Sequence, residues 1–335
     1  MATLTHDRKS APRRTSLSGL GFAILSAASF GLSGALARGL LDTGWSPGAV
    51  SLARIAIAAA VVSPFGALAL RGRWSLLVRN ARSLVFYGLV AVAMPQFSYF
   101  SAVAHMQVAP ALLIEFTAPA AVVVWLWLRR GEPPSRITLS GALLAALGLV
   151  LVLDLVSDAD LSLVGAAWAL VAMVGCATYF VTSADEGTGL PPIALASGGM
   201  VVAAVALAVL GLVGLLPMRA QTAPVELAGA AVAWWVPIVL LGVVTAAVSY
   251  VAGIAAIRRL GSRLASFVAL LEVLSGVVWA WVLLGELPRA IQLLGAVLIL
   301  AGVVAVKLGE RVTVAGAEAA VTTPPGKEAS PHRAR

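Results

Sequence analysis

Apolar residues recur in blocks of about 20 along most of the chain, and short clusters of Arg, Pro, Gly and Asp separate the blocks. A helix of roughly 20 apolar residues crosses the hydrocarbon core of a bilayer, which is about 30 Å thick. The pattern therefore predicts an all-α integral membrane protein of ten transmembrane helices. Their expected ranges are 18–37, 47–70, 84–104, 107–128, 136–153, 161–183, 192–216, 232–256, 263–284 and 289–308.

The two ends of the chain lack this pattern. Residues 1–16 are polar and basic, and residues 309–335 show no apolar periodicity. Segments of this composition bury too little apolar surface to fold, so we expect two disordered cytoplasmic tails. The basic N-terminal residues and the apolar run from Leu20 also resemble a signal peptide. We favour a first membrane span, because further predicted spans follow it.

Composition and charge support a membrane environment. The chain is 60% hydrophobic and only 11% charged, whereas soluble domains carry about 25% charged residues. The net charge of +8 does not indicate a nucleic-acid partner, because most Lys and Arg residues lie in the tails and in alternate short loops. Loops 71–82, 129–136 and 258–263 hold many of them, and the positive-inside rule then places both termini in the cytoplasm. The expected location is the inner or plasma membrane, with the lipid bilayer as partner.

The chain contains an internal repeat. A shift of 154 residues places the segment 111–150 on 265–304. Two Trp, a Gly-Glu pair and a Pro then coincide, among them Trp125 with Trp279. Chance readily matches small apolar residues but not this combination in one register.

The repeat defines two units of five spans each, 17–153 and 154–308. An odd number of spans reverses the direction in which the second unit enters the membrane. The units are therefore expected to have inverted topology, in agreement with four arginines in the loop 71–82 inside and Arg219 outside. Inverted repeats around a site near the bilayer midplane are typical of secondary transporters.

Three ionisable residues lie within predicted spans: Arg54, Glu115 and Glu272. A charge at the bilayer centre costs at least about 2.5–3.5 kcal/mol on insertion scales, so such a residue faces a cavity or a partner. We predict that all three serve substrate binding or proton coupling. The structural alternatives are a hydrogen bond between helices for each glutamate, and an Arg54 side chain that extends to the membrane interface or pairs with an acid.

Polar and aromatic residues gather in the spans next to those that hold the glutamates. Gln96 and Tyr99 lie in predicted span three, and Tyr250 lies in span eight. We expect spans three, four, eight and nine to line the substrate path. Prolines such as Pro95 interrupt helical hydrogen bonding there, and the freed carbonyls either bind a substrate ammonium group or mark a bend.

Other motifs favour packing rather than chemistry. Glycines at helical spacing, such as Gly141 with Gly148 and Gly295 with Gly302, allow close approach of helices, either within the chain or in a homodimer. The single cysteine, Cys176, lies in an apolar block. The sequence carries no metal-ligand spacing, Walker motif or nucleophile elbow. We therefore expect no metal, no cofactor and no enzymatic activity.

The duplicated block reads WLWLRRGEPPSRITLSGALLAALG and WAWVLLGELPRAIQLLGAVLILAG. It resembles the EamA repeat of the drug/metabolite transporter superfamily, and the resemblance covers about residues 17–308. Arg54 resembles an arginine that this family often carries in its second span. The run PQFSYFSAVAHMQVAPALLIEFTAPAAV is similar to the threonine and homoserine exporters of the family. This resemblance implies amino-acid efflux, with Glu115 placed to meet an ammonium group.

One position departs from the family pattern. Second repeats of the family commonly read Glu-Pro where this chain has Glu272-Val273. Pro119 is nevertheless present at the matching place in the first repeat. The two halves are therefore not required to bend alike.

Taken together, these features predict a secondary transporter that exports a small metabolite by alternating access, with threonine or homoserine as the preferred substrate. A carrier of lipid-linked or drug-like substrates is the alternative within transport. A non-transporting membrane scaffold or sensor is the alternative outside it. The candidate site residues are Glu115, Glu272, Arg54, Gln96, Tyr99 and Tyr250.

Overall fold

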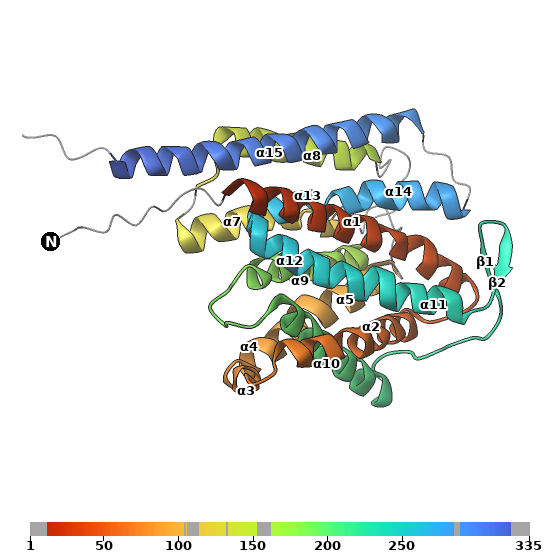
Figure 1. The fold of residues 1–335 in the computed structure, drawn as a ribbon. Helices are drawn as coiled ribbons and strands as arrows, with labels where there is room; N and C mark the ends of the chain where they lie inside the picture. The colour runs from red at the N-terminus through yellow and green to blue at the C-terminus, as the bar shows by residue number, and fades with distance from the viewer. Residues whose placement is uncertain are drawn as a thin grey trace, which may run out of the picture.

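The computed structural model describes residues 12–103, 105, 114–131, 133–152, 162–284 and 289–322. Over these ranges the structure is helical apart from its loops and one two-stranded hairpin. Figure 1 shows long helices that run in roughly one direction, with the hairpin and helix α3 at opposite ends of the molecule. The elements are α1 (Pro12–Asp42), α2 (Pro47–Ala69), α3 (Ser75–Arg79), α4 (Ala81–Phe86), the π-helical segment η1 (Tyr87–Ala93), α5 (Met94–Val103), α7 (Ala118–Arg130), α8 (Arg136–Val152), α9 (Leu163–Ser183), α10 (Pro192–Leu212), β1 (Val225–Leu227), β2 (Ala230–Val232), α11 (Trp235–Gly242), the π-helical segment η2 (Val243–Val248), α12 (Ser249–Leu260), α13 (Ser262–Val268), α14 (Leu271–Leu284) and α15 (Ala290–Thr322).

Seven helical stretches in the described part of the chain are long and apolar enough to cross a membrane. Two shorter apolar helices, Ala118–Arg129 and Arg136–Leu151, accompany them. Many apolar side chains on these helices point outward; Leu293 and Val297 of α15, for example, are 56% and 60% exposed. An apolar surface of this extent is unfavourable in water, so lipid is its solvent. The predicted multi-pass membrane protein is confirmed at this level.

Each half of the chain packs its first helix against the other half. Helix α1 packs against α12 and α14, whereas α9, its counterpart in the second half, packs against α5 and α7. The remaining helices pair across the repeat, α2 with α10 and α8 with α15. In Figure 1 the α8–α15 pair lies along the top and the α2–α10 pair toward the bottom, with helices such as α1, α9 and α12 between them and α3 and α4 at the lower left. The result is two sets of three spans, one around α1 and one around α9.

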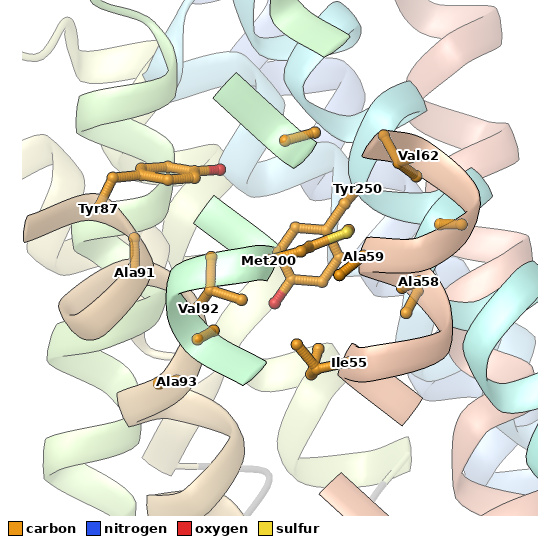
Figure 2. Close-up of a cluster of buried hydrophobic side chains, with 14 of the residues drawn as sticks. Ile55, Ala58, Ala59, Val62, Tyr87, Ala91, Val92, Ala93, Met200 and Tyr250 are labelled. Carbon is orange, nitrogen blue, oxygen red and sulfur yellow. The ribbon is translucent and has the colours of Figure 1, made fainter. Parts of the chain in front are cut away.

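The largest apolar core joins the two halves. It contains Ile55 of α2, Val92 of η1, Met200 of α10 and Tyr250 of α12. Figure 2 shows the Tyr250 ring at the centre of this cluster, with the alanines of α2 on one side and Val92 on the other. Small alanines let the helices approach one another, and the larger side chains fill the space between them. This core fixes α2 and α10 against both sets of spans.

The glycine pairs that the sequence singled out face each other within the chain. A Cβ atom on Gly141 would lie 2.8 Å from the carbonyl oxygen of Gly302, and one on Gly148 would lie 2.6 Å from that of Gly295. Because the opposing atoms belong to the backbone, larger residues would push α8 and α15 apart. Of the two roles predicted for these glycines, close packing within the chain is the one observed.

Two π-helical segments, η1 and η2, occupy related places in the repeat. At the 154-residue register, Tyr87–Ala93 falls on 241–247 and thus overlaps Val243–Val248. A π-helical segment widens the helix and disturbs the regular i→i−4 hydrogen bonding. Such segments are rare in proteins, and those that occur often lie at functional sites. Their recurrence in both halves indicates that the repeat preserved a specific backbone feature that the apolar pattern does not encode.

The described parts of the fourth and ninth predicted spans each contain a turn; residues 107–113 of the fourth span lie outside the described residues. Phe116 and Thr117 form a turn before α7, and Ala269 and Leu270 form a turn between α13 and α14. At the repeat register these turns coincide within one residue. The second half therefore interrupts its helix even though Val273 stands where the family pattern has a proline. The interruption does not depend on a proline.

Two features differ from the sequence-based expectation. The hairpin of β1 and β2 was not predicted, because its turn is formed by Ala228 (φ 52°) and Gly229 (φ 74°) rather than by the usual Asn-Gly. In addition, helix extends into both expected tails: α1 begins at Pro12, within the tail expected over 1–16, and α15 continues to Thr322, within the tail expected over 309–335. The rest of the two expected tails, 1–11 and 323–335, lies outside the described residues. The continuation of α15 is rich in alanine, the best helix former, and it extends a helix that is already nucleated.

Candidate functional site

Arg54 lies at the centre of the molecule and is almost completely covered. Its side chain, on α2, is 3% exposed. Nη1 donates a hydrogen bond to Oε1 of Gln96 at 3.1 Å, and Nη2 donates to the carbonyl oxygen of Thr245 at 2.9 Å. The guanidinium carbon lies 4.5 Å from the centre of the Phe30 ring, a cation–π geometry. Arg54 thus connects α1, α2, α5 and η2.

The backbone of η2 explains how a carbonyl becomes available to Arg54. Thr245 belongs to this π-helical segment and is fully buried. Side chains insert into a helix where the i→i−4 ladder is interrupted. The Thr245 hydroxyl donates to the Leu241 carbonyl at 2.8 Å, and the Thr245 carbonyl accepts from the arginine. The π-helical segment therefore supplies a hydrogen-bond acceptor to Arg54, whose hydrogen bonds in the described part of the chain include none to a carboxylate.

Glu115 and Glu272 flank the interruptions in their spans. Glu115 directly precedes the turn before α7, and Glu272 lies in the first turn of α14. A carboxylate near a helix N-terminus is stabilised by the unpaired N–H groups and the helix dipole. Both side chains are partly exposed, in contrast to Arg54. The charge of Arg54 acts on both of them, and Glu115 and Glu272 act on each other.

The predicted polar and aromatic residues lie around these charges. Gln96 is 8% exposed, and besides accepting from Arg54 it shares a side-chain hydrogen bond with Tyr250. The Tyr250 ring packs against Phe30 at 6.3 Å and edge-on against Tyr179 at 5.5 Å. Tyr99 is partly exposed and interacts electrostatically with both glutamates. The structure brings all six predicted site residues into one neighbourhood.

Sequence reasoning missed two members of this neighbourhood. Phe30 stands in an apolar run and gave no signal of its contact with Arg54. Thr245 contributes a backbone carbonyl, which every residue type has. Cys176, which the sequence did not assign to the site, also lies near the two glutamates: it is partly exposed on α9 and interacts electrostatically with both of them.

Other residues that the sequence singled out lie elsewhere. Trp125 and its near neighbours in the two repeats, Trp127 and Trp281, are about half exposed, which is typical of tryptophans at a membrane–water interface. Trp279 instead donates a hydrogen bond to the Ala28 carbonyl at 3.0 Å and joins α14 to α1. Among the described residues no group of His, Cys, Asp and Glu side chains could hold a metal ion.

The fold and the site define a polytopic membrane protein built from two related halves around a central set of charges. The sequence model of the EamA-like transporter family matches residues 17–154 and 163–308, one match for each half. The chain therefore belongs to the EamA-like transporter family, which is a family of membrane transporters for small substrates.

Solved structures share this fold. One crystal structure superposes with a TM-score of 0.71 at 19% sequence identity, covering 90% of this chain and 99% of the other. At this identity the likeness concerns the fold alone. No curated protein matches the chain.

Proposed function

We propose that the protein exports a small metabolite that carries an ammonium group, and that an amino acid such as threonine or homoserine is the preferred substrate. The observation that carries the proposal is the pair of partly exposed carboxylates, Glu115 and Glu272, at the interrupted helices of the two halves. A carboxylate pair in a low-dielectric setting attracts an ammonium group more strongly than it would in water. Half-helix ends that meet near the centre are the usual way in which transporter folds build a substrate site.

The proposed arrangement in the membrane is ten helices, with both termini in the cytoplasm. Transport then proceeds by alternating access, as the spans around α1 move against the spans around α9. A buried apolar cluster lies between these two sets, and its separation would open one end of the path. Its members are Val122 and Leu126 of α7, Phe180 of α9, Ile257 of α12 and Ala265 of α13.

Energy for export is proposed to come from an ion gradient or from exchange. When both are ionised, Glu115 and Glu272 repel each other, and Arg54 is the one cation among the described residues whose charge acts on both. A proton or a substrate ammonium group relieves that repulsion, and the two compete for the same carboxylates. Competition of this kind couples proton entry to substrate exit.

The proposal is tested by transport in liposomes. Purified protein should move labelled threonine, and Glu115→Gln should lower the rate at least about 30-fold, because the bound ammonium group then loses a charged partner, at about 2–5 kcal/mol when the bound substrate excludes water. Glu226→Gln, on the exposed middle position of β1, is the matched control and should transport normally. Equal transport by Glu115→Gln and wild type, with both proteins equally folded, would reject the assignment of Glu115.

A larger, drug-like amine is a second candidate substrate, and one observation favours it. Phe97 and Trp168 form an edge-to-face pair at 5.3 Å, and Trp168 and Tyr99 pack against one small cluster with Ala102. Aromatic surfaces of this kind bind organic cations through cation–π contacts. Inhibition of threonine transport by a quaternary aromatic amine would support it.

A further inference from the structure

The three ionisable residues of the site, Arg54, Glu115 and Glu272, differ in how much of each side chain a ligand can reach. Arg54 is 3% exposed, both of its terminal nitrogens donate hydrogen bonds, and Phe30 covers its guanidinium. Its remaining nitrogen, Nε, is buried without a partner and so is equally withdrawn from the surface. A substrate carboxylate would have to displace Gln96 or the Thr245 carbonyl to bind the guanidinium.

The carboxylates are placed differently. Glu115 and Glu272 are both partly exposed and lie beside partly exposed Tyr99. Among the described residues, Arg54 is the one cation whose charge acts on them. A ligand at these carboxyl groups therefore meets two acidic side chains, while the guanidinium of Arg54 is hydrogen-bonded to Gln96 and to the Thr245 carbonyl and is covered by Phe30.

From this geometry we infer that the site selects its substrate by the ammonium group and does not require a substrate carboxylate, and that Arg54 is a positioning residue which ties the Gln96 region to η2. This inference rests on the proposed function, because it concerns the same site. It extends the substrate class from amino acids to their amides and esters and to the corresponding primary amines.

The inference separates two chemical changes to one amino acid. Converting the carboxylate of threonine to an amide removes a negative group that no residue of the proposed site binds. The conversion also removes the electrostatic repulsion between that carboxylate and the two glutamates. Acetylating the amine removes the positive charge that the glutamates attract. A site that is built for a polar group strongly rejects an analogue lacking that group, because its own buried groups are left unpaired.

The experiment measures binding to the full-length protein in lipid nanodiscs by titration calorimetry, with L-threonine, L-threoninamide and N-acetyl-L-threonine as probes. The expected result is that the amide binds within threefold of threonine or more tightly, and that the acetylated compound binds at least 100-fold more weakly. An amide that binds tenfold or more weakly than threonine overturns the inference and leaves the proposed function standing. Binding of N-acetyl-L-threonine as tight as that of threonine also overturns it.

Two further outcomes distinguish the inference from the proposed function. Binding of the amide without binding of threonine supports the inference and rejects an amino acid as substrate. Failure of both threonine and the amide to bind rejects both. Each outcome is thus decisive for at least one of the two statements.

Arg54→Lys tests the role of the arginine itself, because lysine keeps the positive charge that acts on both glutamates. If Arg54 only positions the site, this variant changes the affinities for threonine and for the amide by the same factor, so their ratio stays at its wild-type value. If Arg54 receives the carboxylate through its guanidinium, threonine loses affinity and the amide does not. Glu115→Gln should lose both ligands.

Discussion

At the scale of single residues, Ser46 joins the two halves at one end of the molecule. Its hydroxyl donates to the Pro217 carbonyl at 2.6 Å and accepts from the Arg219 N–H at 2.9 Å. It also caps α2 by accepting from the Ala49 N–H at 3.3 Å. The side chain is 1% exposed, so water does not replace these contacts.

Ser46→Ala should therefore lower the stability of the protein more than the loss of one hydroxyl group usually does. It removes the hydrogen bonds to the Arg219 N–H and the Pro217 carbonyl, each worth about 0.5–1.5 kcal/mol, and it removes a helix cap worth about 1 kcal/mol. We expect a clear fall in the thermal unfolding midpoint of the purified protein in detergent. Ser140→Ala is the matched control, since that hydroxyl is exposed and bonds within its own helix. Equal midpoints for the two variants would contradict this role.

The site shows which residues a sequence can reveal. Arg54, Glu115 and Glu272 were identifiable because a charge in an apolar span is costly and so needs a reason. The partners of Arg54 were not identifiable. Phe30 reads as one more apolar residue, and the Thr245 carbonyl leaves no mark in the sequence because it belongs to the backbone. That Arg54 is covered rather than open to a ligand required the structure.

At the scale of secondary-structure elements, the packing of α8 on α15 depends on backbone contact. The Cβ position of Gly148 lies 2.6 Å from the Gly295 carbonyl and 2.7 Å from the Ile299 nitrogen. Neither atom is the end of a flexible side chain, so a methyl group forces the helices apart. Gly34, on α1, is also helical, but a Cβ there meets nothing within 4 Å.

These two glycines form a matched pair of variants. Gly148→Ala should destabilise the protein by roughly 1–3 kcal/mol through overpacking. Gly34→Ala should be neutral or stabilise by about 0.4–1 kcal/mol, because alanine restricts the unfolded chain. Thermal unfolding in detergent measures both. A Gly148→Ala variant as stable as Gly34→Ala would show that α8 and α15 do not meet as described.

The sequence predicted elements unequally well. Glycine spacing indicated that helices approach closely, but it did not say that α8 and α15 are each other's partner. The π-helical segments η1 and η2 could not be predicted, because one extra residue per turn over so short a length barely alters the apolar pattern. The interruption at Ala269 and Leu270 lacked its expected proline and was equally hidden.

At the scale of the whole molecule, the loops of the two halves are hydrogen-bonded to each other in a related way at both ends. At one end, the turn between α1 and α2 binds the segment after α10 through Ser46 and through Trp45, whose indole donates to the Gln221 carbonyl at 2.8 Å. At the other end, the segment after α2 binds the turn between α9 and α10, where Asn80 donates to the Thr188 carbonyl at 2.9 Å. Equivalent loops of the two halves are thus joined crosswise at opposite ends, which is the relation that inverted repeats require.

This relation yields a prediction about orientation. Val78 of α3 is 80% exposed and lies at one end, and Glu226 of β1 is exposed at the other. Replacing Cys176, the single native cysteine, with serine gives a background in which Val78→Cys or Glu226→Cys is the one thiol. A membrane-impermeant maleimide should label Glu226→Cys in spheroplasts, and Val78→Cys in inside-out vesicles.

The physical reason is the charge around each position. Val78 is flanked by four arginines, which the positive-inside rule holds in the cytoplasm, whereas Arg219 is the single basic residue between α10 and α11. Labelling of both thiols from one side would contradict the inverted arrangement itself. Labelling of each from the side opposite to the expected one would keep the inversion but place both termini outside. Since export and uptake differ only in which side is loaded first, that second outcome would also reverse how the transport measurements are interpreted.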